Sequence, residues 1–255
     1  MTYCVAISIK SGLVFVSDSR TNAGVDNVST YSKMHRFGND GERQFVMLSA
    51  GNLATTQGVI QQLKKDIHQY APVNLMTVSS LTDAADYIGT VNLQQQEKHT
   101  GGGSNYEASF IVGGQIMGSK PQAHLVYPQG NHITTSKDTP YLQIGESKYG
   151  KPILDRILVP NVNLETAALC GLVSMDSTMR SNLTVGPPIE VMVYETDKFV
   201  LNRHYRFNDD SEYLRDLKKS WDQNLKDAFN RLPPIAWSAN WDNQAKDDQA
   251  DQAEM

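Results

Sequence analysis

The 255-residue sequence has little of what marks several specialised classes of protein. Its only cysteines, Cys4 and Cys170, match no metal-ligand or redox spacing, so we expect packed free thiols in a reducing compartment. Aromatic residues make up 8% of the chain, and 18 glycines and 10 prolines are ordinary numbers. This composition excludes a fibrous or wholly disordered chain. A chain of this length predicts one large domain that is stable on its own hydrophobic core.

The sequence also lacks an excess of basic residues and any long hydrophobic run. The 23 Lys+Arg residues face 28 Asp+Glu residues, and the acidic side chains gather beyond residue 239. The rest of the chain is therefore nearly neutral, which argues against a surface for nucleic acid. No apolar run approaches the ~20 residues that cross a bilayer, and Met1-Thr2-Tyr3-Cys4 lacks the basic start of a secretory signal. We expect a cytoplasmic protein that binds neither nucleic acid nor membrane.

Hydrophobic periodicity predicts strands and helices in separate groups. We expect strands at 3–9, 13–16, 45–48, 109–114, 124–127, 188–194 and 198–200, and helices at 53–67, 80–96, 149–157 and 164–182. Residues 21–32 are polar and are expected to form a loop. Because the order is strands, helices, strands, helices, strands, stacked antiparallel sheets covered by helices are favoured over βαβ units.

The C-terminal part of the sequence has a different character. We expect a domain at 1–206, followed at 207–255 by a helical extension with an acidic, disordered tail. A helix at 210–231 is indicated by apolar residues on one stripe, namely Leu214, Leu217, Trp221, Leu225 and Phe229. This stripe and the aromatic pair Trp237 and Trp241 could contact another subunit, or the stripe could pack on its own subunit. Both alternatives stay open.

Three familiar site signatures are incomplete in this sequence. The segment 113–120, GGQIMGSK, ends in Gly-Ser-Lys where a phosphate-binding loop has Gly-Lys-Ser/Thr, and a predicted strand follows it instead of a helix. The six histidines show no metal-ligand spacing. No Gly-x-Ser-x-Gly motif is present. We therefore expect neither a metal nor a cofactor.

The start of the first strand carries groups suited to nucleophilic catalysis. Thr2 is small enough for methionine aminopeptidase to remove Met1, which would put a hydroxyl and a free amine on one residue. The unperturbed pKa of an α-amine, ~7.7–8.0, suits a general base. Asp18, at the end of the next strand, could hold Lys33 beside Thr2, where its charge would favour the alkoxide. The alternatives are an ordinary second residue and a surface ion pair.

These residues belong to a longer pattern that resembles proteasome-type threonine peptidases of the N-terminal nucleophile class. The pattern covers about residues 2–206 and consists of Thr2, Leu13-Val14-Phe15-Val16-Ser17-Asp18-Ser19-Arg20, Lys33-Met34-His35-Arg36, Ser49-Ala50-Gly51, Gly145-Glu146-Ser147-Lys148-Tyr149 and Leu172-Val173-Ser174-Met175-Asp176. Its opening through Ser29-Thr30 and its ending from Pro187-Pro188 resemble the bacterial ancestral β-subunit group, Anbu. The resemblance implies an α+β fold, a four-layer αββα sandwich.

The resemblance also implies roles for individual residues. Thr2 would be the nucleophile and its amine the base, Lys33 would lower the hydroxyl pKa, and Asp18 would position Lys33. The Gly51 N–H would stabilise the oxyanion. Ser147 and Asp176 would form hydrogen bonds around the amine. Further residues are implied in support (Arg20, Ser177, Ser181) and in substrate binding (Thr21, Tyr31, His35, Ser49, Leu53).

The sequence departs from the family pattern at two places. Lys33 lies thirty-one residues after Thr2, one fewer than in the common proteasome pattern, so the intervening loop would be shorter. Met179 stands where that pattern has a serine after Asp176, so Ser177 or Ser181 would have to substitute. We expect removal of Met1 alone to produce the active form.

Three functions remain open at this point. The first is a threonine endopeptidase or amide hydrolase that acts on a peptide or amide within a homo-oligomer, in a ring or a helical assembly. The second is a non-catalytic proteasome-like scaffold, because fold and activity separate readily. The third is an N-terminal nucleophile amidohydrolase for a small γ-glutamyl or related amide. The sequence identifies no unfoldase or operon-encoded partner.

Overall fold

The structure is a computed structural model that describes residues 1–22, 28–98 and 106–235. The chain divides into two compact units, Met1–Glu212 and Tyr213–Met255. Both tail tryptophans (Trp237 and Trp241) and the acidic end lie outside the described residues.

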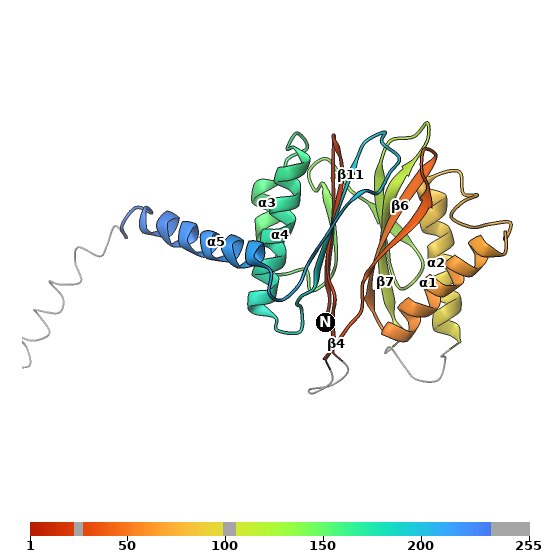
Figure 1. Ribbon diagram of the computed structural model, residues 1–255, viewed down its shortest axis with the longest axis horizontal. Coiled ribbons are helices and arrows are strands. Elements are labelled where there is room, and N and C mark those ends of the chain that lie inside the picture. Colours follow the sequence, from red (N-terminus) through yellow and green to blue (C-terminus); the bar gives the residue numbers. More distant parts are fainter. Residues whose placement is uncertain (23–27, 99–105, 236–255) are drawn as a thin grey trace, which may run out of the picture. The chain divides into compact units, whose positions relative to one another are not determined.

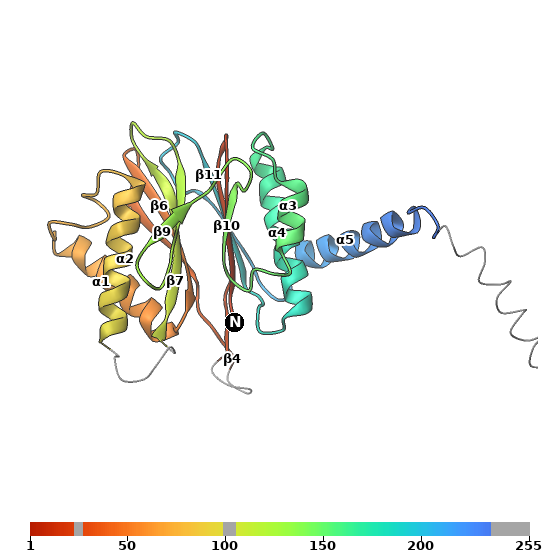
Figure 2. The same cartoon turned by 180° about the vertical axis from the view of Figure 1, so that it is seen from behind.

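Two sheets and two pairs of helices form four layers in the first unit (Figures 1 and 2). Sheet 1 has the strand order β10 (Tyr141–Gly145), β1 (Tyr3–Ile9), β2 (Gly12–Asp18), β11 (Ile189–Glu195) and β12 (Arg203–Phe207). Sheet 2 has the order β5 (Met34–Asn39), β6 (Arg43–Gly51), β7 (Ala108–Ile116), β8 (Gln122–Val126) and β9 (His132–Thr134). Helices α1 (Leu53–His68) and α2 (Leu81–Glu97) cover sheet 2, and α3 (Lys151–Ile157) and α4 (Leu164–Ser181) cover sheet 1. The predicted αββα sandwich is confirmed.

Strand β1 is buried on both faces, which explains its continuous apolar sequence. Cys4 and Ala6 belong to the apolar cluster between the two sheets. Ile7 faces the other way, toward α4, where it lies with Val16 next to Gly171. A Cβ at Gly171 would lie 2.8 Å from Val16, so the glycine lets the helix approach the sheet closely. Strand β1 is thus packed between sheet 2 and α4.

Helix α1 begins directly where strand β6 ends. The side chain of Asn52 accepts a hydrogen bond from the Thr55 N–H and caps the helix. The apolar face of α1, including Val59 and Leu63, packs with α2 and sheet 2 in a second core. Helix α2 is capped in the same way by Ser80. Both helix starts were predictable from the capping residues.

The segment expected to be a polar loop, 21–32, contains short strands. Strand β3 (Arg20–Asn22) pairs antiparallel with β4 (Val28–Thr30) in a two-stranded ribbon outside the main sheets. The prediction of a loop is therefore wrong at residues 21–22 and 28–30. Two strands this short carry too few apolar residues to produce a periodic signal.

The last hairpin differs from the prediction in its second strand. Strand β11 pairs with β12 at Arg203–Phe207, and not with 198–200. Asp197 and Phe199 have φ values of 64° and 48°, a left-handed conformation that interrupts a strand. Strand β12 is polar and lies at the edge of its sheet, so it lacks the apolar pattern of a buried strand.

Helix α5 (Glu212–Asn230) runs through the second unit and is amphipathic, as predicted. None of its residues is buried, and Leu225 and Phe229 on its apolar stripe are exposed. In the part of the chain that the structure describes, no helix combines the length and the hydrophobicity needed to span a bilayer.

Candidate active site

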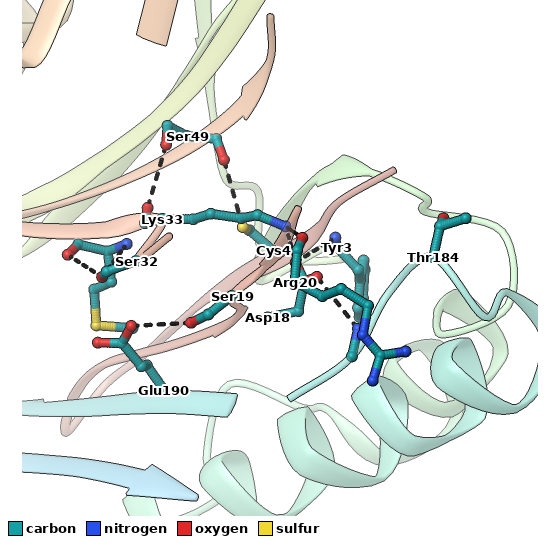
Figure 3. Close-up of polar contacts among 12 residues, drawn as sticks. Tyr3, Cys4, Asp18, Ser19, Arg20, Ser32, Lys33, Ser49, Thr184 and Glu190 are labelled. Atoms are coloured by element: carbon teal, nitrogen blue, oxygen red, sulfur yellow. Dashed lines mark hydrogen bonds and ion pairs between the residues drawn. The ribbon is translucent and has the colours of Figure 1, made fainter. Parts of the chain in front are cut away.

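A buried ion pair lies where strand β2 ends and strand β5 is about to begin. The Lys33 ammonium donates hydrogen bonds to Asp18 Oδ1 at 2.7 Å and to the Arg20 carbonyl at 2.7 Å (Figure 3). The two charged side chains are 9% and 0% exposed. Lys33 therefore has one defined position, in which its ammonium points toward the start of β1.

Asp18 is held by further donors from the backbone. Its carboxylate accepts hydrogen bonds from the Tyr3 N–H at 3.0 Å and the Gly186 N–H at 3.3 Å. Burial raises the pKa of Asp18, and the Lys33 ammonium and these N–H groups oppose the rise. The carboxylate thus links Lys33 to the backbone of β1. This contact makes the position of Lys33 depend on the first strand.

Thr2 precedes β1 and is fixed by the end of β10. The Thr2 carbonyl accepts a hydrogen bond from the Glu146 N–H at 2.7 Å, and Tyr3 pairs with Gly145. Gly145 has a φ of 81°, and a Cβ there would lie 2.0 Å from the Thr2 carbonyl oxygen. Only glycine permits this approach, so Gly145 sets the position of the chain's start.

Burial and three nearby charges act on the amino group at the N-terminus, which belongs to Met1 in this chain. Burial lowers its pKa from the usual 8.0, and the Lys33 charge lowers it further. Asp18 and Glu146 oppose this change. A lowered pKa leaves more of the amine neutral near pH 7, which is the state that can accept a proton.

Gly51 forms the junction between β6 and α1. Its φ is 113°, and a Cβ would lie 2.3 Å from the Glu107 carbonyl oxygen, so a side chain at this position would be strained. The next residue, Asn52, donates its N–H to the same carbonyl at 2.9 Å. The glycine thus lets the strand turn directly into the helix.

A pocket of about 770 Å³ connects these groups. It brings together the following predicted site residues: Thr2, Arg20, Thr21, Tyr31, Lys33, His35, Ser49, Gly51 and Leu53. Asp18 lies behind Lys33 and contacts it directly. Tyr31 and Leu53 line the pocket and so are not simply core residues.

Besides Asp18, four of the predicted residues do not line this pocket. Ser147 follows β10, and its carbonyl accepts a hydrogen bond from Gln143 Nε2 at 3.3 Å. Asp176 and Ser177 are partly buried near the end of α4, and Ser181, the last residue of that helix, is exposed. Helix α4 does reach β1, since the Ser174 hydroxyl lies 2.7 Å from the Tyr3 hydroxyl.

Two groups of residues near the site have no role in the sequence-based prediction. Glu146 donates its N–H to Thr2, and its carboxylate acts on the N-terminal amine. One face of α1 also lines the pocket beyond Leu53, through Thr56, Gln57, Ile60, Gln61 and Lys64. The spacing of three and four residues along this face is the signal that could have identified it.

Two titratable side chains in and behind the pocket are uncharged near pH 7. Burial lowers the pKa of His35 to about 4; the Lys64 charge adds to this effect and Glu190 opposes it. Burial also raises the pKa of Cys4, whose thiol donates to the Ser49 carbonyl at 3.8 Å. Cys4 therefore stays a protonated, packed thiol and not a thiolate nucleophile.

The site offers the parts of an acyl-transfer centre and no ligand set for a metal. A hydroxyl, an amine, a fixed ammonium and a strand-end backbone N–H all border one pocket. Within residues 1–22, 28–98 and 106–235, no group of three or more His, Cys, Asp or Glu side chains is arranged to hold a metal ion.

Comparisons with known proteins place this geometry in a family. The profile of the family described as "Proteasome subunit" matches residues 2–194. The chain is similar to the solved structure of Anbu (ancestral beta-subunit) from Yersinia bercovieri, with 45% sequence identity and a TM-score of 0.88. The match covers 91% of this chain and 99% of the Yersinia chain. Anbu from Hyphomicrobium sp. strain MC1 is 42% identical with a TM-score of 0.85, over 92% of this chain and 99% of that one.

A third solved structure is the helical assembly of the Anbu complex from Pseudomonas aeruginosa. It is 45% identical with a TM-score of 0.88, over 92% of this chain and 99% of that one. The comparison with curated protein sequences gives no match. The family profile covers most of the chain, and these structures match nearly their whole length. The chain therefore belongs to the proteasome subunit family and, within it, to the Anbu group of ancestral β-subunits.

Proposed function

We propose that this protein is a cytoplasmic threonine-type hydrolase of peptide or other amide bonds, with Thr2 as its N-terminal nucleophile. The observation that carries the proposal is the Lys33 ammonium, which Asp18 holds at 2.7 Å in the wall of the pocket that Thr2 also lines. A purely structural ion pair needs neither a hydroxyl at the chain's start nor a pocket. Family membership supports the same chemistry.

The reaction proceeds in two acyl-transfer steps. The Thr2 hydroxyl attacks the substrate carbonyl carbon, and its proton passes to the Thr2 amine. The Gly51 N–H donates a hydrogen bond to the oxyanion, and the Lys33 charge favours the alkoxide. The C–N bond then breaks, and the leaving amine takes the proton from the Thr2 ammonium. Water next attacks the Thr2 ester, with the amine again as base, and releases the acid.

Met1 is the feature that controls this reaction. It is 62% exposed and lines the pocket, and its peptide bond ties up the nitrogen that Thr2 would use as a base. Removal of Met1 would create an amine next to the groups that now influence the Met1 amine, namely Lys33, Asp18 and Glu146. A form that retains Met1 is therefore inert.

We further propose that the protein acts within a homo-oligomer. A relative that is 45% identical was solved as a helical assembly. The exposed apolar stripe of α5, which includes Leu225 and Phe229, offers area for contacts between subunits. The domain arrangement that fits this proposal is a catalytic sandwich at 1–206 with an assembly extension at 207–255.

The nucleophile is tested with a peptide epoxyketone, which needs both the hydroxyl and the amine of one residue. Intact-mass spectrometry should show an adduct only on molecules that have lost Met1, so unprocessed molecules in the same sample serve as a control. Thr2→Ala should abolish the adduct. Thr90→Ala, on the exposed side of α2, should not change it.

Two results would contradict the assignment. An adduct that persists in Thr2→Ala, or one that maps to Cys4, would show that another group reacts. A processed protein with free Thr2 that never reacts would favour the non-catalytic scaffold.

A further inference from the structure

The pocket that begins at Thr2 is positively charged. Its lining includes the cations of Arg20, Lys33 and Lys64, and no Asp or Glu lines it among the described residues. Asp18, which does not line the pocket, forms an ion pair with Lys33. Arg20 donates to a neutral acceptor, the Leu183 carbonyl, at 2.8 Å. The remaining charge therefore favours an anionic group inside the pocket.

Lys64 extends this charge along the face of α1. It follows Leu53, Thr56, Gln57, Ile60 and Gln61 at helical spacing, and all of them line the pocket. Its backbone lies about 16 Å beyond Leu53 along the helix axis, at 1.5 Å per residue. Helical side chains lean toward the N-terminus, so the ammonium is directed back toward the Thr2 end.

The surroundings of Lys64 leave its charge available. No ion pair of Lys64 occurs within the described ranges, and its charge contributes to the low pKa of His35 in the pocket wall. His35 is neutral near pH 7 and adds no competing charge. Gln57 and Gln61 lie between Lys64 and the Thr2 end and can donate amide hydrogen bonds to a carboxylate.

We propose that this pocket selects substrates whose acyl side carries a carboxylate on a long side chain, with glutamate at P1 as the natural case. Lys64 is the residue that sets the preference. The inference rests on the proposed function and specifies its substrate class. Aspartate is a poorer fit because its carboxylate is one methylene shorter and lies farther from Lys64. A basic P1 side chain is disfavoured by repulsion.

The test uses two epoxyketones that differ only in having Glu or Gln at P1, which have the same shape and different charge. Rates of Thr2 adduct formation are measured by intact mass on the processed protein. We expect the Glu probe to react roughly fivefold faster at low salt, with a smaller ratio at high salt. Lys64→Gln should bring the ratio close to one, and Lys64→Glu should invert it.

Lys65→Gln is the matched control, since Lys65 is an exposed neighbour on α1 that does not line the pocket. It should keep the wild-type ratio. Equal rates for the two probes, or a Glu preference that survives Lys64→Gln, would overturn the inference and leave the Thr2 chemistry intact. If neither probe nor a third with Leu at P1 forms an adduct, the proposed function fails and the inference fails with it.

Discussion

The two sides of the site are built in different ways. On one side, Asp18, Lys33 and Gly51 lie at the ends of strands, and each is fixed by backbone contacts or by the buried ion pair. On the other side, the residues expected to support the amine come from the segment after β10 and from the end of α4. There, Ser147 and Ser181 do not line the pocket. The charge from this side that acts on the N-terminal amine is that of the Glu146 carboxylate.

This difference shows which parts of the site tolerate change. Asp18 and Gly51 end the internal strands β2 and β6, whose positions are set by ladder hydrogen bonds on both sides, and Lys33 is held by its buried ion pair with Asp18. A substitution at these positions is therefore costly. A residue after an edge strand or at a helix end has fewer constraints, and a different residue can take over its role. We therefore expect large effects on the strand side and small, pH-dependent effects on the amine side.

The buried ion pair should give the largest effect. Asp18→Asn leaves the Lys33 ammonium buried without a counter-charge, and it should lower the free energy of unfolding by about 3–5 kcal/mol. Activity should be lost as well. Lys33→Met should also destabilise the fold, because it leaves the buried Asp18 carboxylate without its counter-charge. The double variant should recover part of the loss, as measured by urea unfolding.

The exposed pair of Lys151 and Asp155 is the matched control. It has a similar N–O distance of 2.9 Å, but its side chains are 53% and 48% exposed. Lys151→Met should therefore change the free energy of unfolding by less than about 1 kcal/mol. If the Asp18 and Lys33 variants changed the free energy of unfolding as little as this, the buried ion pair would not stabilise the fold and the prediction would be wrong.

The fold could be predicted where apolar residues are continuous and not where they alternate with polar ones. Strand β1 is buried on both faces, and its apolar sequence marked it clearly. Strand β5 was missed because only Met34 and Phe37 of its six residues are buried. Strand β10 was missed because it is short and follows a polar segment, although it fixes the position of Thr2.

On the strand side of the candidate site, the sequence was enough to predict which residues lie together. Thr2, Asp18 and Lys33 are close in sequence, and the β1–β2 hairpin brings the first two together. Glu146 lies far from Thr2 in the sequence, and only the pairing of Tyr3 with Gly145 brings it close. Lys64 depends on the packing of α1 beside the pocket, which no local pattern specifies.

Gly51 should give the next largest effect. Gly51→Ala places a Cβ 2.3 Å from the Glu107 carbonyl at a φ of 113°, so the backbone must shift and the N–H with it. We expect kcat to fall by about 10²–10³, the usual cost of losing an oxyanion donor. Gly41→Ala is the control, because Gly41 also has positive φ but no atom within 4 Å of its Cβ. An unchanged kcat in Gly51→Ala would refute the oxyanion role.

The amine side should give the smallest effect, visible in the pH profile. In the unprocessed chain the Glu146 carboxylate favours the charged form of the Met1 amine and so raises its pKa, against the lowering by burial and Lys33. We expect the same effect on the Thr2 amine once Met1 is removed. Glu146→Gln keeps the shape of the side chain and removes this charge, so the amine pKa should fall further. The amine is then neutral at lower pH, and the acid limb of kcat/KM should move to lower pH, with the plateau within about twofold of wild type. Ser147→Ala should leave the limb in place. If the acid limb moved in Ser147→Ala and not in Glu146→Gln, the Glu146 assignment would be wrong. Ser147, as the family pattern implies, would then be the residue that supports the amine.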